Sequence, residues 1–211
     1  MESHKLVAVI VAHPDDETLW AGGTILNHPE WECFIITLCR KGDHDRAQRF
    51  YEVLKEFKAH GKMGDLDDGP EQDPLDAYKV QHALLQLLPA TKFDLIITHN
   101  PHGEYTTHIR HQEVSHAVIN LWHNGKINAP ELWIFAYEDH NRHYFPKSIK
   151  SADLHFPLAR AIWQHKYDII TKLYGFDKDS WEAETTPTEE AFWQFTDPGK
   201  AFNWLESQQK Q

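Results

Sequence analysis

The sequence LVAVIVAHPDDE, residues 6–17, places an unbroken apolar run directly before one histidine and three carboxylic acids. An apolar run without polar alternation predicts a β-strand that is covered on both faces, as in a parallel sheet. In α/β proteins, the carboxyl ends of such strands form the crevice where ligands bind. Carboxylates this close together repel one another unless a cation or hydrogen bonds offset their charge. The stretch therefore predicts an α/β fold with a metal-binding site at the end of its first strand.

Beyond this stretch, apolar segments of strand length alternate with segments of helical periodicity, which is typical of βαβ units on a parallel sheet. Strands are expected at residues 5–11, 32–38, 93–98 and 132–137. Helices are expected from residue 16 or 17 and over residues 45–60, 75–88, 108–122 and 158–174. The stretch 61–74, which contains glycines and prolines, predicts a loop around a short edge strand. We therefore expect a Rossmann-like, three-layer α/β/α fold with a mostly parallel sheet in a single domain.

The length of 211 residues fits one domain with a sizeable core. We expect that core to span residues 1–175. Residues 176–211 are acidic, show no clear periodicity and contain three tryptophans, Trp181, Trp193 and Trp204. We expect this C-terminal extension to pack on the same domain, with its tryptophans either against the body of the domain or in the interface of a homo-oligomer.

The formal net charge of −11 limits the partners of the protein. An acidic surface repels the phosphates of nucleic acids and anionic lipid headgroups, so we expect neither nucleic-acid nor membrane partners. The longest apolar runs have the length of strands, and the first residues lack the pattern of a secretory signal. The two cysteines, Cys33 and Cys39, are too few for a disulfide framework and are expected to be reduced thiols in a cytoplasmic protein.

Histidine is unusually frequent, with 16 among 211 residues. Three histidine pairs have a spacing of three residues: His99 with His102, His108 with His111, and His140 with His143. Random placement gives about one such pair, so spacing alone does not choose among them. The helix expected after the strand at 93–98 would carry His108 and His111 on one face of its first turn, toward the crevice. This setting favours the second pair as functional, and His140 and His143 are expected on a surface loop.

Two motifs together resemble a known family. The first is His13-Pro14-Asp15-Asp16-Glu17 followed by Gly22-Gly23-Thr24, and the second is Gly103-Glu104-Tyr105 followed by His108-x-x-His111. Their order, separation and strand-end settings resemble the LmbE-like or PIG-L family of zinc-dependent N-deacetylases, most clearly over residues 5–175. The resemblance implies a hydrolase whose core spans residues 1–175. Its substrate would be an amino sugar, or another small molecule containing N-acetylglucosamine, from which it removes the N-acetyl group.

The resemblance also implies a role for individual motif residues. His13, Asp16 and His111 would bind one Zn²⁺ ion per chain, since three protein ligands leave a coordination position for water. Iron(II) or cobalt(II) can use the same ligands. Asp15 would be the general base that takes a proton from the attacking water. His108 would stabilise the developing oxyanion or protonate the leaving amine.

Other positions match the family less closely. Those expected to contact the substrate are Arg46, Tyr105, Arg110 and, more loosely, residues 66–69. Glu17 would cap the first helix or support the ligands, and His99 would orient a ligand from behind. The family usually has His-Pro-Asp-His at the second motif, whereas Ile109 and Arg110 occupy the middle positions here. An arginine close to His108 would favour the neutral form of its imidazole.

Two alternative functions remain open. The protein could be a metal-dependent hydrolase of another bond, such as a phosphoester, because Zn²⁺ with a carboxylate base serves several electrophiles. The sequence shows no second set of histidines and carboxylates for a two-metal site, which argues against this alternative. The protein could also be a non-catalytic module that binds a metal or a sugar. The presence of both Asp15 and His108 argues against that function.

Overall fold

The computed structural model describes residues 4–105 and 108–208. Its strands are β1 (Leu6–Val11), β2 (Glu32–Cys39), β3 (His60–Leu66), β4 (Leu95–Thr98), β5 (Leu132–Phe135), β6 (Tyr137–Glu138), β7 (Lys147–Ser148), β8 (Leu154–Pro157) and β9 (Glu189–Phe195). Seven of them form one sheet in the order β3-β2-β1-β4-β5-β9-β8, while β6 and β7 pair separately. Strands β1 to β5 run parallel, and β9 runs antiparallel to both of its neighbours. The sheet is therefore mostly parallel, as predicted.

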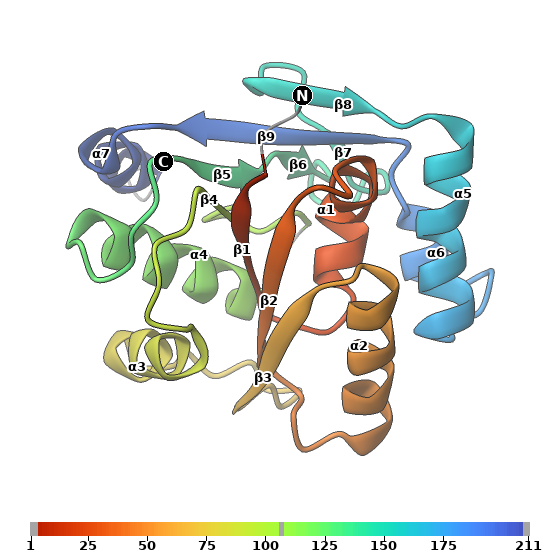
Figure 1. The fold of residues 1–211 in the computed structure, drawn as a ribbon, viewed down its shortest axis with the longest axis horizontal. Coiled ribbons are helices and arrows are strands. Elements are labelled where there is room, and N and C mark those ends of the chain that lie inside the picture. The colour runs from red at the N-terminus through yellow and green to blue at the C-terminus, as the bar shows by residue number, and fades with distance from the viewer. Residues whose placement is uncertain (1–3, 106–107, 209–211) are drawn as a thin grey trace.

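Helices cover both faces of this sheet (Figure 1). They are α1 (Asp16–Asn27), α2 (His44–Glu56), α3 (Ala77–Leu87), α4 (Ile109–His123), α5 (Arg160–Asp168), α6 (Trp181–Thr185) and α7 (Pro198–Gln208), with the π-helix η1 (Ile169–Leu173) continuing α5. Helices α1 and α2 and the α5–η1 segment lie against one face, and α3, α4 and α7 lie against the other (Figure 1). This arrangement confirms the predicted three-layer α/β/α fold in a single domain.

Strand β1 shows why the apolar run at the start of the chain determines this architecture. Val7 and Val9 belong to the core on the side of α1 and α2, whereas Ala8 and Ile10 belong to the core on the side of α3 and α4. All four side chains are fully buried. Burial of a valine or isoleucine side chain contributes about 1.5–3 kcal/mol, so a central strand needs apolar residues at every position.

The topology of the sheet places a ligand crevice beside β1. From β1 the chain adds β2 and β3 on one side, and then returns to add β4 and β5 on the other side. The strand order therefore reverses between β1 and β4, and ligands bind outside the carboxyl ends of the strands at such a point. The motif that begins at His13 follows β1, and His99 and the motif that begins at Gly103 follow β4. The fold thus brings residues from the two sequence motifs to the same edge of the sheet.

Three parts of the structure extend the sequence prediction. Residues 60–66 form an edge strand, β3, which pairs with β2 and takes up the first part of the segment 61–74, where a loop around a short edge strand was expected. The helix expected at 158–174 is α5 together with η1. The stretch after residue 176, which had no assignment, contains α6, α7 and strand β9. Strand β9 lies within the main sheet, between β5 and β8.

In the described parts of the chain, no helix combines the length and the apolar character needed to cross a bilayer. Cys33 and Cys39 are both buried and free, as the sequence predicted. Trp193 and Trp204 pack near each other, with ring centroids 6.4 Å apart. They lie against the core on the side of α4 and α7. Trp181 has a different setting, which is described with the cleft below.

Candidate metal centre and catalytic cleft

The turn between β1 and α1 presents Asp15 in an unusual backbone conformation, with φ 113° and ψ −32°. A non-glycine residue with positive φ carries strain of about 1–3 kcal/mol, and such strain persists only where surrounding contacts hold it. Here the Asp15 N–H donates to Glu17 Oε2 at 3.1 Å, and Glu17 Oε1 accepts the Tyr174 hydroxyl at 2.6 Å. Glu17 is fully buried. It therefore supports the backbone of the turn, and the side chain of Asp15 lines a cleft.

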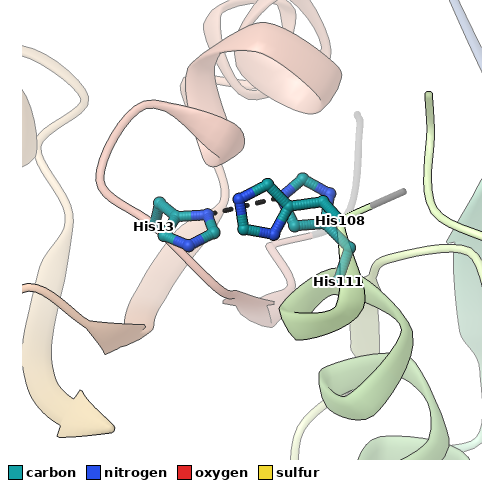
Figure 2. A group of neighbouring side chains, drawn as sticks. All are labelled: His13, His108 and His111. Carbon is teal, nitrogen blue, oxygen red and sulfur yellow. Dashed lines mark hydrogen bonds between the residues drawn. The ribbon is translucent and has the colours of Figure 1, made fainter. Parts of the chain in front are cut away.

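Three atoms of the predicted metal ligands form a compact triangle. Asp16 Oδ2 lies 3.2 Å from His13 Nδ1 and 3.3 Å from His111 Nε2, and the two nitrogens are 3.3 Å apart. Figure 2 shows His13 and His111 turned toward each other, from the turn after β1 and the first turn of α4. With zinc–ligand distances of about 2.0–2.1 Å, the edges of a tetrahedral site measure about 3.3 Å. The donor atoms thus have the spacing that a single zinc ion requires.

Two other triplets in the described residues also bring donor atoms within 4.8 Å of one another. One is His13 with His108 and His111, and the other is Asp16 with His99 and His111. In the second triplet, His99 Nε2 already accepts the backbone N–H of Ala12 at 2.9 Å. Its lone pair is therefore occupied by a hydrogen bond. This contact favours a supporting position for His99, behind Asp16, over a position as a ligand.

Glu104 connects two of these imidazoles from behind. Its Oε2 accepts from His111 Nδ1 at 2.6 Å and from His99 Nδ1 at 2.9 Å, and its Oε1 accepts the Asn100 N–H at 2.8 Å. Burial opposes ionisation of Glu104, but the His99 and His111 rings lower its pKa to about 2. An imidazole that donates from Nδ1 keeps Nε2 unprotonated and available to a metal. The sequence motif contains Glu104 but does not predict its role, because its partners meet only in the folded chain.

Asp68 occupies a similar position behind His13. Its Oδ1 lies 3.3 Å from His13 Nε2, and its Oδ2 accepts from Arg40 Nε at 2.8 Å. Gln72 Nε2 donates to Oδ1 at 3.1 Å. Burial favours a raised pKa, but the contacts with His13, Gln72 and Arg40 hold the pKa of Asp68 well below its usual range. Residues 66–69 were expected on the substrate side, and Asp68 both lines the cleft and lies against a predicted metal ligand.

The two neighbouring aspartates of the first motif differ in their electrostatics. Burial and the adjacent charge of Asp16 raise the pKa of Asp15 to about 8. Burial also opposes ionisation of Asp16, but the His111 and His99 rings hold its pKa well below the usual range. When their surroundings give two carboxyl groups different pKa values, the two groups suit different chemical roles. Asp16 therefore suits a permanently charged ligand, and Asp15 suits a group that exchanges protons near neutral pH.

His108 lies at the start of α4, next to the candidate ligands (Figure 2). Its ring centroid is 4.5 Å from that of His13 and 4.7 Å from that of His111. Among the described residues, its buried Nδ1 has no hydrogen-bond partner. Burial and the neighbouring His111 and His13 rings lower the pKa of His108 to about 3. His108 is thus a neutral imidazole at pH 7.

The cleft beside this cluster has a volume of about 330 Å³. Arg46 lines it, and its Nη1 lies 3.3 Å from Asp15 Oδ2. Tyr105 and Trp181 form an aromatic wall, with ring centroids 4.6 Å apart. Trp181 is 36% exposed, although tryptophan is usually well covered. Arg46 and Tyr105, which were expected to contact the substrate, therefore both line this cleft.

Arg110, also expected to contact the substrate, is directed away from the cleft. Its side chain is 1% exposed. Nε donates to the Asp67 carbonyl at 2.6 Å, Nη2 donates to the Asp73 carbonyl at 2.7 Å, and Nη1 pairs with Glu113 at 2.6 Å. Consecutive residues of a helix point about 100° apart, so the turn of α4 that aims His111 at the cleft aims Arg110 elsewhere. The expectation for Arg110 is therefore corrected by the structure.

The other two histidine pairs do not form a second cluster of this kind. His102 and His140 line a separate cavity of about 550 Å³, which shares Tyr105 with the cleft. His140 begins a run of three residues with positive φ, His140, Asn141 and Arg142. His99 is the member of the first pair that reaches the candidate metal centre, through its 3.4 Å approach to Asp16.

Comparison with solved structures shows the same fold in enzymes of low sequence identity. N,N'-diacetylchitobiose deacetylase from Pyrococcus horikoshii is 14% identical, with a TM-score of 0.69 over 91% of this chain and 84% of that chain. The zinc-inhibited form of teicoplanin deacetylase Orf2 is 12% identical, with a TM-score of 0.64 over 90% and 97% of the two chains. GalB, the 4-carboxy-2-hydroxymuconate hydratase from Pseudomonas putida KT2440, is 16% identical, with a TM-score of 0.61 over 92% and 97%.

Sequence comparison is more specific. Uncharacterized protein L374 of Acanthamoeba polyphaga mimivirus is 23% identical in an alignment 182 residues long, and the match covers 80% of this chain and 75% of that protein. The family model PIG-L, described as GlcNAc-PI de-N-acetylase, matches residues 8–122, more than half of the chain and both motifs of the candidate metal centre. The protein therefore belongs to the PIG-L, or LmbE-like, family of deacetylases.

Proposed function

We propose that the protein is a zinc-dependent hydrolase that removes the acetyl group from an N-acetylated amino sugar. The observation that carries the proposal is the triangle of His13 Nδ1, Asp16 Oδ2 and His111 Nε2, with edges of 3.2–3.3 Å, beside a cleft. Family membership supports a deacetylase-type hydrolase. The proposal adds the metal, the substrate class and the residue roles.

Asp15 is the proposed general base. When bound, zinc supplies a Lewis acid that polarises an amide carbonyl and makes water a better proton donor. Asp15 takes the proton of the attacking water and returns it to the leaving amine, so that the products are acetate and an amine. A group whose pKa lies near the working pH performs both transfers best. The raised pKa of Asp15, about 8, supports this assignment.

His108 is the proposed donor to the carbonyl oxygen. Its lowered pKa, about 3, makes it a poor source of protons at neutral pH, but a neutral imidazole still donates one hydrogen bond. A fixed donor aimed at the oxygen where negative charge develops lowers the barrier of acyl transfer. Of the two roles that the family resemblance allows for His108, the structure favours stabilisation of the oxyanion.

The cleft favours a small sugar as the substrate. Its volume of about 330 Å³ lies at the lower end of typical ligand sites, which span about 300–1,000 Å³. The wall of Tyr105 and Trp181 can cover the apolar face of a sugar ring. Arg46 and Glu182 line the same cleft and offer a donor and an acceptor for hydroxyl groups. These features support an N-acetylated monosaccharide unit as the part of the substrate that enters.

The charges of the cleft argue against a phosphoester. Its two arginines are already paired, Arg40 with Asp68 and Arg46 with Asp15. The acidic side chains that line the cleft outnumber these arginines: Asp15, Asp16, Asp43, Asp68 and Glu182. A phosphate dianion would therefore have to compete with Asp68 and Asp15 for these arginines, whereas an acetamide is neutral and needs no such partner.

Metal analysis combined with an acetate-release assay on N-acetylated sugars tests the proposal, with nitrophenyl phosphate as the comparison substrate. We expect about one zinc per chain and loss of both zinc and turnover in Asp16→Ala and His111→Ala. Asp15→Asn should keep the metal and lose turnover by a factor of about 10² or more. The exposed Asp179→Asn is the matched control.

Each other outcome contradicts a defined part of the proposal. If Asp15→Asn loses zinc as Asp16→Ala does, Asp15 is a ligand and the assignment of the base is wrong. Release of phosphate without release of acetate would contradict the substrate class. Tight sugar binding without acetate release by zinc-loaded protein would identify a non-catalytic module.

A further inference from the structure

The segment between β3 and α3, residues 67–76, is anchored to the first turn of α4. Arg110 donates to two of its carbonyls, those of Asp67 and Asp73, at 2.6 and 2.7 Å. Glu113, which pairs with Arg110 at 2.6 Å, also accepts the backbone N–H of Leu75 at 2.6 Å. One ion pair on α4 thus binds the backbone of this segment at three positions.

The anchored segment carries Asp68, the carboxylate behind His13. The Asp67 carbonyl bound by Arg110 belongs to the peptide bond that leads directly into Asp68. Asp68 in turn lies 3.3 Å from His13 Nε2, while His13 Nδ1 faces Asp16 at 3.2 Å. Among the described residues His13 Nε2 forms no hydrogen bond, and Asp68 faces it at ion-pair distance, where a carboxylate favours the proton on that nitrogen and leaves Nδ1 free for a metal. The contacts therefore run without a gap from Arg110 through Asp67 and Asp68 to His13.

The position of Arg110 in α4 links it to both histidines among the candidate ligands. Arg110 precedes His111, so the same turn of α4 presents one candidate ligand directly and reaches the other through the anchored segment. The guanidinium is 1% exposed, and each of its three nitrogens has a partner within 2.7 Å. A planar guanidinium with donors in a fixed fork suits this task, whereas an aspartate would repel the two carbonyls.

We propose that Arg110 is a positioning residue of the candidate metal centre. It holds residues 67–75 in place so that Asp68 lies against His13 and keeps His13 Nδ1 directed at Asp16 and His111. The inference rests on the proposed function, because it takes His13 as a metal ligand. It assigns a role to the residue that replaces the aspartate usual in the family motif. Arg110 acts on the metal through Asp68, and it does not touch the substrate.

A double-mutant cycle on metal affinity tests this role. Zinc affinity is measured by competition with a chromophoric chelator for the parent, Asp68→Asn, Arg110→Met and the double variant. Loss of a residue behind a metal ligand typically weakens metal binding about 10–100-fold. We expect each single variant to bind zinc about 10-fold or more weakly than the parent. The zinc affinity of the double variant should be no lower than that of the single variant with the lower affinity. The d–d absorption of bound Co²⁺ should change in the same way in both single variants.

The controls separate positioning from general destabilisation. Arg160→Met removes an exposed arginine and should leave both readouts unchanged. If Arg110→Met does not fold, Arg110→Lys takes its place in the cycle, since lysine keeps the charge but cannot bind both carbonyls and Glu113 at once. Thermal unfolding of the metal-free proteins establishes that each variant is folded.

The inference is overturned if the double variant loses zinc affinity by the product of the two single-variant factors, because Arg110 and Asp68 then act independently. It is also overturned if either single variant binds zinc as tightly as the parent. Failure of the parent itself to bind zinc would be a different result, since it would contradict the proposed function.

Discussion

Replacing Glu104 by glutamine perturbs the support behind two imidazoles with almost no change in shape. Three N–H groups point at the two oxygens of Glu104: those of His99 Nδ1, His111 Nδ1 and the Asn100 backbone. Glutamine keeps one acceptor oxygen and replaces the other by an NH₂ group. If the NH₂ faces the imidazoles, two hydrogen bonds are lost. If it faces Asn100, one is lost, so the least costly arrangement leaves one buried donor opposite another donor.

The expected magnitude follows from this count. Two buried donors then lack partners, the Asn100 N–H and the glutamine NH₂, and at about 1–3 kcal/mol each the free energy of unfolding of the metal-free protein should fall by about 2–6 kcal/mol. Glutamine also lacks the charge that strengthens hydrogen bonds from the imidazoles. Zinc affinity should therefore fall about 10–100-fold, the usual effect of removing such a carboxylate. Neither effect is expected in Glu206→Gln, which removes the charge of an exposed glutamate.

Two measurements on the same preparations check these values. Urea denaturation of the metal-free proteins gives the free energy of unfolding. Chelator competition gives the zinc affinity. If Glu104→Gln binds zinc as tightly as the parent, then Glu104 does not hold His111 for a metal. The assignment of His111 as a ligand would then lose its structural support.

Three further predictions concern stability and binding. Lys166 and Glu190 are fully buried and 2.7 Å apart, so Lys166→Met should leave a buried charge unpaired and cost about 3–5 kcal/mol in urea denaturation. The folded state lowers the pKa of Glu104 from 4.5 to about 2, so the ionised carboxylate stabilises the fold fully above pH 4.5. This stabilisation is lost as the pH falls toward 2, and the melting temperature should fall with it. Trp181→Ala should raise KM for an N-acetylated sugar about 10-fold with little change in kcat, because lost stacking removes about 1–1.5 kcal/mol of binding that substrate and transition state share. Trp181→Phe should restore most of the lost affinity, and steady-state kinetics measure both variants.

The central strands could be predicted from sequence because their environment leaves a local mark. Strand β1 is covered on both faces and is therefore apolar throughout. Strand β9 lacks this mark because Glu190 occupies a buried position in it. That position is tolerated through contacts from distant segments: Lys166 donates to Glu190 at 2.7 Å, and the backbone N–H groups of Gly23 and Thr24 donate at 2.7 and 2.6 Å. The pattern of β9 therefore makes sense only once the partners are known.

The candidate site shows the same division between local and distant information. The first motif could be interpreted because His13, Asp15 and Asp16 lie together in one turn. Asp68 and Glu104 were given no supporting role, since each meets its histidines only when separate strand ends converge. Position 110 was misjudged because a motif comparison does not contain the rotation between neighbouring residues of a helix.

The place of β9 in the sheet has a consequence for the order of events during synthesis. Within the main sheet formed by the described residues, β8 has β9 as its sole neighbour, and β9 follows it in the chain by way of α5, η1 and α6. A chain emerging from the ribosome therefore exposes His13 early, while β8 has no complete partner in the sheet until Phe192 has been made. Trp181, one wall of the cleft, emerges within that same interval. The last of the three candidate metal ligands, His111, is thus made before Trp181 and before the strand that pairs with β8.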